Sequence, residues 1–552
     1  MFCKSSKVLV ILPTDMFDYF KKNKKLFFIT VVFFLVQLPF LDQLSLLRGE
    51  RDIMLSGFSL AKTGKDLYGN LLSLEFLGID PFVPFVPIYI AALWWLIIPV
   101  KSVFTARLLF IIISTLIPFL IHEIVKHITG HKKLAFWTAV IFVFSPGVFH
   151  LSRLALEIGI AFPLLLAGIL ATLKKKYIFA YFSFFLSFFS YHGFRPLIPV
   201  LLVYLAFFEY LRTRQLGGFL KKSGVHIFFF VVLVGLSIII DGNLMQSRIN
   251  DVAFSNFEKW SNEVIYRRNT SIAPKVMTVV FDNKMTALFQ YMRDVFIKGL
   301  DLRYLFLNGD ESSLYATTFT GQFFLTSAIF YFLGILYLAK KAKKNYYYMA
   351  FIIIIGLVPS VVNISYISYS IRSMLSSVGH SFLIACGLML FFEFLPKAVM
   401  FLKKIIVFLL VVIFMVEFGY FAYNYYARRT ITMSEMFFES ERSVAKYMLS
   451  HDKPYKIYTH VPRDVFFSYL FFNNKADMRK AQEIAKAGRP YKIDGFVIDV
   501  CPVNPHFTYR KEMIMDTCLT EKEYHQYVVG KKFDDLIPYT NYSFKNAYFI
   551  FN

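Results

Sequence analysis

The apolar stretch VPFVPIYIAALWWLIIPV, residues 83–100, decides how this chain is threaded through a membrane. It is long enough to cross a bilayer, which takes about 17–25 mostly apolar residues. If it crosses, HEIVKHITGHKK and every later basic cluster fall outside, although Lys and Arg favour the cytoplasmic side. If it lies on the outer surface as an interfacial helix, with Trp94 and Trp95 at headgroup level, every cluster falls inside. We therefore expect a juxtamembrane helix here and not a span.

The composition marks the whole chain as a membrane protein. Of its 552 residues, 57% are hydrophobic and only 18% are charged, whereas a soluble domain has about 25% charged residues. The net charge of +23 does not indicate nucleic-acid binding, because the lysines lie in short clusters between apolar runs. The basic KKNKK at residues 21–25 precedes an apolar run with no small-residue cleavage site, which predicts a signal anchor with a cytoplasmic N-terminus.

These features predict a polytopic α-helical protein of the plasma or inner membrane with about eleven spans. We expect the spans near residues 26–41, 104–123, 134–149, 155–173, 177–190, 197–210, 225–240, 322–339, 347–362, 376–395 and 403–423. The outer face then carries the loops 41–105 and 241–321, several short turns and the tail from about residue 424. We expect a transmembrane domain over 1–423 and an extracytoplasmic soluble domain over 424–552.

The tail differs in kind from the rest. It has mixed charge and strand-like runs such as YKIYTHV and GFVIDV, preceded by the amphipathic pattern SEMFFESERSVAKYMLSH. These patterns predict a small α/β or α+β domain. Cys501 and Cys518 lie within it, and they either pair, if the segment is outside, or remain free thiols. Their spacing does not fit a compact zinc site.

Acidic and basic residues gather on the predicted outer face. The first loop carries Glu50, Asp52, Asp66 and Asp80, and the later turns carry His150, Arg153, Glu157, His192, Arg195 and Arg372. A carboxylate can take the proton of a hydroxyl nucleophile, and arginine matches the oxygens of a phosphate leaving group. The alternative is that these charges are ordinary anchors at span ends. The sequence has no Walker, HExxH or GxSxG motif.

Glu157 is the hardest of these residues to treat as an anchor. SRLALEIGIAF places it within the start of an apolar helix, where an ionisable group is costly and indicates function. Arg153 lies four residues earlier, so the two side chains would share one helical face. A structural ion pair between them is the other interpretation.

Several of these segments resemble the family-39-like glycosyltransferases, the relatives of dolichyl-phosphate-mannose protein mannosyltransferases and of the aminoarabinose lipid A transferase. The matching segments, in order, are SLAKTGKDLYGN, PIYI, FTARL, SPGVFHLSRLALE, SYHGFRPLIPVLL, FDNKMTALFQYMRDVF, LRYLFLNGDESSLYATTFTGQFF and SYSIRSML. The resemblance implies a GT-C fold, a site between the first outer loop and the membrane, a polyprenyl-phosphate sugar donor and inversion at the anomeric carbon. It covers nearly the whole chain.

The chain departs from that family at two places. The family's first loop has an Asp-Glu pair whose leading acid is the usual base, and the corresponding residues here are Gly49 and Glu50. The lysine common before the family's Pro-Leu-Tyr segment is also missing, since Phe82 and Val83 occupy that stretch. The base is therefore Glu50, or Asp52 two residues on, or the enzyme is impaired.

The resulting hypothesis is an inverting glycosyltransferase of hexosyltransferase type. We expect Glu50 or Asp52 as base and Glu157 as a second site acid. We expect the donor phosphate to be held by Arg153, Arg195, Arg372 and His192, and the further site candidates are Asp80, His150 and Tyr89. The acceptor is a protein, a lipid or a glycan, and we predict no cofactor and no metal, although some members of the superfamily use a divalent ion. The alternatives are a non-catalytic protein that binds a lipid-linked glycan, because the acidic pair is broken, and a transporter of lipid-linked sugars.

Overall fold

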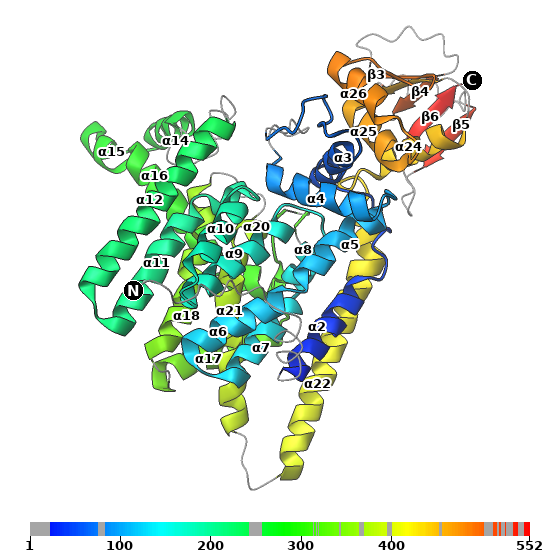
Figure 1. Ribbon diagram of the computed structural model, residues 1–552. Coiled ribbons are helices and arrows are strands. Elements are labelled where there is room, and N and C mark those ends of the chain that lie inside the picture. The colour runs from blue at the N-terminus through cyan, green and yellow to red at the C-terminus, as the bar shows by residue number, and fades with distance from the viewer. Residues whose placement is uncertain are drawn as a thin grey trace, which may run out of the picture.

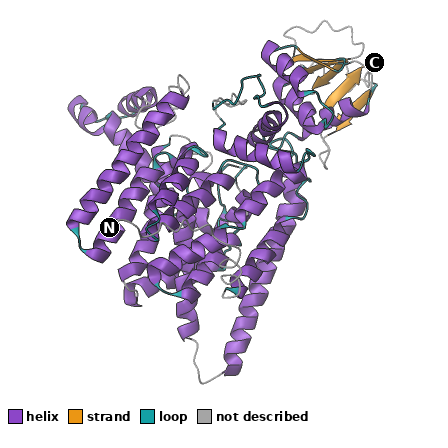
Figure 2. Cartoon of the chain, viewed as in Figure 1, coloured by secondary structure: helices purple, strands orange, loops and turns teal. Residues whose placement is uncertain are grey.

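The computed structural model describes residues 23–74, 83–241, 257–312, 314–315, 317, 319–341, 344–363, 369–394, 400–451, 455–501, 512–515, 518–519, 525, 534–538 and 546–551. A helical bundle makes up the larger part, and the strands lie together in a smaller C-terminal region (Figure 2). This arrangement confirms the expected helical membrane architecture with a C-terminal domain that contains a sheet.

The bundle is built from the apolar runs of the sequence. Its first helices are α2 (Lys24–Gln37), α3 (Arg48–Thr63), α4 (Phe85–Ile97), α5 (Val103–Ser114), α6 (Ile117–Thr129), α7 (Lys132–Val143), α8 (Pro146–Ser152), α9 (Ile158–Leu173), α10 (Tyr177–Phe188), η1 (His192–Phe194), α11 (Leu197–Thr213) and α12 (Leu216–Asp241). They are followed by α14 (Phe257–Asn269), α15 (Lys275–Phe281), α16 (Lys284–Lys298), η2 (Arg303–Leu307), α17 (Ser327–Lys341), α18 (Lys344–Gly356), α19 (Val358–Val362), α20 (Tyr369–Arg372), α21 (Met374–Phe394) and α22 (Met400–Tyr423).

The number of spans is not confirmed as about eleven. Within the described residues, six helical segments are long and apolar enough to cross a membrane, or seven if the bent pair α7 and α8 counts as one. The six are Val103–Thr129, His192–Leu211, Leu216–Ile240, Asn345–Val362, Met374–Phe394 and Lys404–Thr432. Other expected spans, among them α9 and α10, form shorter apolar helices.

Helix α4 is the stretch on which the predicted threading depends. It has 13 residues, which gives a length of about 20 Å against an apolar bilayer core of about 30 Å. It lies across the end of the bundle, whereas α2 and α22 run along it (Figure 1). It packs tightly on α3, because a Cβ on Gly57 would lie 2.7 Å from the Cβ of Ala91. Trp95 is buried and donates to the Met54 carbonyl at 2.8 Å, so its indole N–H docks α4 on α3. The expected position of Trp95 at headgroup level stays a prediction.

The C-terminal domain contains the strands and helices that the tail predicts. Its elements after α22 are η3 (Asn424–Arg428), α23 (Arg429–Thr432), α24 (Glu439–Ser450), β1 (Lys456–Thr459), α25 (Pro462–Phe472), α26 (Met478–Ala487), β2 (Tyr491–Ile493), β3 (Phe496–Val500), β4 (Glu512–Met515), β5 (Asp535–Pro538) and β6 (Asn546–Phe551). The strand order is β2-β3-β1-β4-β6-β5, with β1 parallel to both β3 and β4 and the other pairs antiparallel. Cys501 and Cys518 are joined in a disulfide, as one of the two sequence-based alternatives predicts.

Basic helix ends gather at the end of the bundle away from this domain. The end of α21 and the start of α22 lie toward the bottom of Figure 1, and the C-terminal domain lies at the top. Lys175, which follows α9, and Lys222 of α12 both pair with Glu209 of α11. The expected threading, with these lysines on the cytoplasmic side and the C-terminal domain outside, stays a prediction.

Candidate active site

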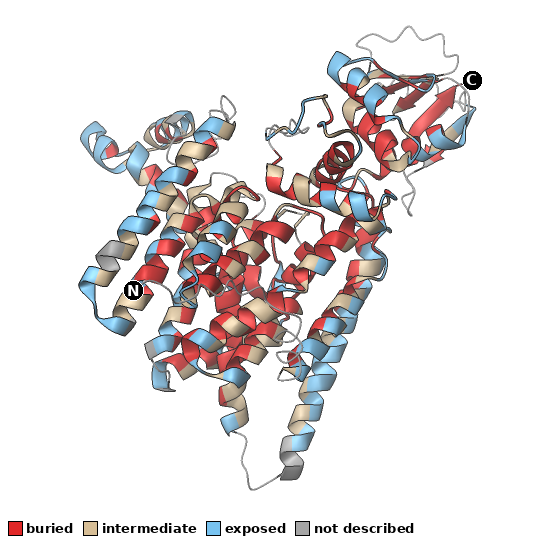
Figure 3. Cartoon of the chain, in the orientation of Figure 1, coloured by how far each residue is buried: buried red, intermediate tan, exposed pale blue. Residues whose placement is uncertain are grey.

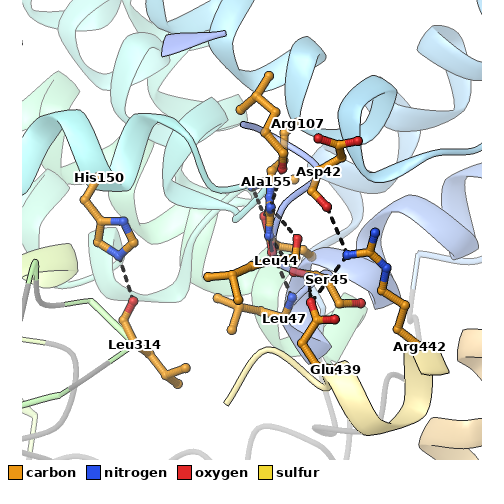
Figure 4. Close-up of polar contacts among 12 residues, drawn as sticks. Asp42, Leu44, Ser45, Leu47, Arg107, His150, Ala155, Leu314, Glu439 and Arg442 are labelled. Carbon is orange, nitrogen blue, oxygen red and sulfur yellow. Dashed lines mark hydrogen bonds and ion pairs between the residues drawn. The ribbon is translucent and has the colours of Figure 1, made fainter. Parts of the chain in front are cut away.

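Glu50 is fully occupied by structural contacts. Its Oε1 accepts from Arg107 Nε at 2.9 Å and from the Ala155 amide at 2.7 Å. Its Oε2 accepts from Arg107 Nη2 and from the Leu47 amide, both at 2.8 Å. The side chain is 0% exposed, and Figure 4 shows Leu47, Arg107 and Ala155 converging on this point. A general base needs a lone pair within reach of the acceptor, so this geometry gives Glu50 a structural role.

The partner of Glu50, Arg107, also holds the loop between α2 and α3. Its Nη1 donates to the carbonyls of Leu41 and Leu44 at 2.7 and 2.9 Å, and its Nη2 donates to the carbonyl of Ser45 at 2.7 Å. Buried carbonyls require such donors. Arg107 was not among the predicted site residues. It lies in the FTARL segment, and a charged residue inside an apolar run is the sequence signal that could have identified it.

Arg153 has a similar structural role. Its guanidinium donates to the carbonyls of Gln37 and Pro39 at 2.8 and 2.7 Å and to the Tyr426 hydroxyl at 3.0 Å. Its other surroundings are aromatic, with Tyr425 within 5.5 Å. These contacts bind the end of α2 to the start of the C-terminal region, and they leave the predicted phosphate-binding role of Arg153 without support from the geometry.

The predicted pairing of Arg153 and Glu157 on one helical face is wrong. Helix α8 ends at Ser152 and α9 begins at Ile158, so the two residues lie on an irregular segment between helices. The chain leaves the helical path here because the Ala155 amide turns to Glu50. A non-local contact thus overrides the local spacing.

His150 is buried in a polar cluster of its own. Its Nδ1 lies 3.0 Å from the Tyr425 hydroxyl, and its Nε2 lies 2.8 Å from the Leu314 carbonyl and 3.0 Å from Arg429 Nη2. Figure 4 shows the contact between His150 and Leu314. Arg107, Arg153 and Arg429 line a crevice here together with aromatic rings, with a volume of about 30 Å³. That is room for about two water molecules, so a sugar phosphate does not fit in this state.

Asp52 has different neighbours from Glu50. The two residues are two positions apart in α3, so their side chains point to opposite sides of the helix. It is 2% exposed and lies 3.7 Å from Arg51 Nη2. Burial raises the pKa of Tyr68 to about 12, and Asp52 is among the charges that add to the shift. The two first-loop acids therefore do not form one acidic pair.

A half-buried cluster forms around Glu157, the residue that precedes α9. The side chain of Arg372, at the end of α20, is hydrogen-bonded to Tyr191, and Glu157 and Tyr315 lie within electrostatic reach of the same ring. Burial raises the pKa of the Tyr191 hydroxyl, and Arg372 opposes this shift. All four side chains are partly exposed, so the structure places the predicted Glu157 and Arg372 near the same tyrosine.

The position of Arg372 is fixed by an acid that sequence reasoning did not assign. Asp310 accepts from the Ser370 amide at 2.6 Å and from the Ser370 hydroxyl at 2.7 Å. It also accepts from the Ser312 amide at 3.1 Å. Because Ser370 belongs to the short helix that ends at Arg372, these bonds orient that arginine. Asp310 lies in the LNGDESSLY segment of the resemblance, which was the available signal.

The remaining predicted residues lie around this cluster or apart from it. His192 follows Tyr191 directly and is partly exposed. Arg195 donates to Ser237 Oγ of α12 at 2.8 Å and lies over the ring of Phe188. Tyr89 donates to the Ser73 carbonyl at 3.2 Å. Asp66 is used in a turn, where it accepts from the amides of Tyr68 and Asn70, and Asp80 lies outside the described residues.

The C-terminal domain packs on α3 through buried charges. Asp464 of α25 pairs with Arg51 and, at 2.9 Å, with Arg48. Glu439 accepts from the Ser45 amide, and Lys101 donates to backbone carbonyls at the end of α25. These contacts join residues about four hundred positions apart in the chain, so no local pattern reveals them.

The metal expectation stays a prediction. Among the described residues, one group of metal-type ligands was found, His460 with Cys501 and Cys518. The two sulfurs are bonded to each other, and a metal needs free thiolates. The residues present do not fit an ion there.

The fold and the cluster define a polytopic helical membrane protein with a partly exposed acid, tyrosine and arginine at the end of the bundle. The structure is similar to the archaeal oligosaccharyltransferase AglB from Archaeoglobus fulgidus, in complex with an inhibitory peptide and a dolichol-phosphate, with 12% identity and a TM-score of 0.41. That match covers 83% of this chain and 65% of AglB, so this chain spans slightly less than two thirds of AglB. It is also similar to ArnT from Cupriavidus metallidurans bound to undecaprenyl phosphate, with 9% identity and a TM-score of 0.43, over 96% of this chain and 98% of ArnT. No family model and no curated protein matches the sequence.

Neither likeness assigns a function to this chain. The resemblance to the family-39-like transferases stays a prediction.

Proposed function

We propose that this chain is a glycosyltransferase that moves a sugar from a polyprenyl-phosphate donor to an acceptor hydroxyl at the outer membrane face, with inversion. The observation that carries the proposal is the cluster of Glu157, Tyr191 and Arg372, which is partly exposed. It combines a carboxylate with a permanently charged arginine, and these are the two groups that the reaction requires.

The two reacting ends of the substrate match the two ends of the cluster. The acceptor hydroxyl gives its proton to the Glu157 carboxylate, and its oxygen forms a bond to C1 of the sugar. The bond from C1 to the phosphate oxygen breaks, and the phosphate leaves with the electron pair. Arg372 faces that phosphate and stabilises its developing charge. The nearby His192 and Arg195 belong to the same turn and would complete the anion site.

This assignment changes the order of the candidate bases. Glu50 has both oxygens occupied by four hydrogen bonds, so Glu157 replaces it as the first candidate. Asp52 remains the second candidate, and it would reach a substrate only from the opposite side of α3. Both are testable by isosteric amides, which keep the shape and remove the charge.

The experiment uses the full chain in proteoliposomes with a panel of labelled polyprenyl-phosphate hexoses and a membrane extract as acceptor. The readouts are release of polyprenyl phosphate and label on the acceptor. Glu157→Gln should abolish both, and Glu483→Gln, an exposed acid on α26, should leave both unchanged. Full activity in Glu157→Gln would refute the base assignment. Loss of activity in Asp52→Asn alone would move it to that residue.

A second candidate function, a non-catalytic binder of lipid-linked glycans, is favoured by one observation. The leading acid of the family's pair is replaced by Gly49, and a Cβ at this position would lie 3.3 Å from Leu156 Cδ2. The Leu156 side chain thus packs against Gly49, and no ionisable group stands at this position. The same assay separates the two functions, because a binder retains the lipid-linked sugar without releasing polyprenyl phosphate. Movement of the lipid across sealed vesicles without release would indicate a transporter.

A further inference from the structure

A cavity lies at the lysine-rich end of the bundle, away from the proposed active site. It has a volume of about 480 Å³ and opens between the ends of α6, α9 and α11. Its walls are His127, Thr172, Leu173, Lys174, Lys175, Leu205, Phe208, Glu209 and Thr213. The walls combine apolar side chains with two lysines, and an amphiphilic molecule requires both.

The charges around the cavity are unbalanced. Glu123 pairs with Lys126 at 2.6 Å and more loosely with Lys174 at 3.8 Å. Glu209 pairs with Lys222, and its distance to Lys175 is 3.8 Å. Four lysines thus surround two glutamates, and the pairs at 3.8 Å are too long for hydrogen bonds. Lys174 and Lys175 therefore keep donors available for an added anion.

The backbone holds these two lysines in an unusual position. Helix α9 ends with the Lys175 amide bonded to the Thr172 carbonyl and the Lys176 amide bonded to the Ala171 carbonyl. This pattern is a Schellman cap, whose left-handed residue is usually glycine. Here it is Lys175, with a φ of 60°. A lysine at this position is disfavoured for the backbone relative to glycine, and its side chain is placed beside the cavity.

An exposed apolar stripe runs along α11, the helix that also supplies part of the cavity wall. Val200, Val203 and Phe207 are each at least 40% exposed, and their spacing puts them on one face of the helix. Phe207 adjoins Phe208 of the cavity wall. A hydrocarbon chain lying on this stripe would bring its headgroup to Lys174 and Lys175.

We infer that this cavity binds the headgroup of an anionic phospholipid from the leaflet at that end, with the phosphate at Lys174 and Lys175 and an acyl chain along Val200, Val203 and Phe207. The basic residues are on the side predicted to be cytoplasmic, where anionic lipids favour basic pockets between helices. The site is independent of sugar transfer.

The test is lipid retention by the purified full-length protein, measured by native mass spectrometry after incubation with phosphatidylglycerol or phosphatidylcholine. The wild type should retain more phosphatidylglycerol than phosphatidylcholine. K174Q/K175Q should weaken that retention about 30-fold, the factor expected for two lysines near an anionic headgroup. The matched control is K132Q/K133Q, which removes two exposed lysines at the start of α7 that do not line the cavity.

Three outcomes would overturn the inference. These are equal retention of the two lipids, equal weakening in both double variants, and full competition by millimolar inorganic phosphate, which would identify a free anion as the occupant. Thermal unfolding in phosphatidylcholine checks that both variants are folded. Because the readout is binding, a failure of the glycosyltransferase proposal would leave this result unchanged.

Discussion

The sequence favours Glu50 over Glu157 as the base, yet the regions around these two glutamates are built in opposite ways. Around Glu50, both carboxylate oxygens are paired and the side chain is fully buried. Around Glu157, the neighbouring Tyr191 and Arg372 are partly exposed. Removing one partner of a buried charged pair destabilises a structure, whereas a general base must be reachable by the proton that it accepts. The difference in exposure between the two carboxylates, and not their place in a motif, separates the two proposed roles.

The largest effect should come from Glu157→Gln. The variant should fold normally and lose about 10²–10⁴-fold in transfer rate, the usual contribution of a general base. The measurement pairs donor turnover with thermal unfolding of the same preparation. If the unfolding temperature of Glu157→Gln fell as much as that of Glu50→Gln, Glu157 would also have a structural role and the contrast between the two regions would be wrong.

Glu50→Gln should instead act on stability. It leaves the Arg107 guanidinium without its counter-charge, and breaking a buried ion pair costs about 3–5 kcal/mol. Denaturant unfolding in detergent measures this cost. The combined replacement of Glu50 and Arg107 by apolar residues should recover part of it, and a failure of Glu50→Gln to destabilise would show that the pair is dispensable.

Asp464→Asn should loosen the C-terminal domain from α3. It weakens the charged hydrogen bonds to Arg48 and Arg51, each worth about 1.5–3 kcal/mol. Limited proteolysis should cleave the segment between α22 and α24 faster in this variant. Asp477→Asn makes the same replacement at the N-cap of α26, where asparagine can also cap the helix. It is the matched control and should not change the cleavage rate.

The smallest effect should be a pH dependence from Glu441. Burial raises the pKa of this carboxyl to about 6 from its usual value of 4.5. The folded state thus binds more protons than the unfolded state between these values, so stability should fall as the pH rises from about 4.5 to 6 and stay level above. The total is about 2 kcal/mol. Glu441→Gln should remove that slope in unfolding measured from pH 4 to 7, and an unchanged slope would assign the dependence to another group.

Much of the fold follows from local patterns in the sequence. Apolar runs predict the helices of the bundle, and YKIYTHV and GFVIDV predict the strands β1 and β3. Hydropathy does not reveal where a helix bends, because bends such as the 66° break between α7 and α8 depend on packing. This is why the number of spans is harder to predict than their places.

The candidate site was harder to predict than the fold, because the contacts that set the role of each residue join positions far apart in the sequence. Glu50 meets Arg107 across 57 positions and Ala155 across 105. The choice of Glu157 and Arg372 was local in origin, since an acid at the start of an apolar helix and an arginine at a helix end stand out by hydropathy. Whether they are partnered by each other or by structural neighbours is a property of the folded chain alone.

Helix α22 has a mechanical consequence for the domain that follows it. In the most apolar part of the segment Lys404–Thr432, only 6% of the residues are buried within the protein. Figure 3 shows most of α22 as exposed. If α22 spans the bilayer as its composition predicts, a change in bilayer thickness would tilt it at a modest energetic cost. The helix continues directly into η3 and α23, which carry Tyr425 and Arg429 into the cluster around His150. A change in bilayer thickness would thus shift the junction between the bundle and the C-terminal domain.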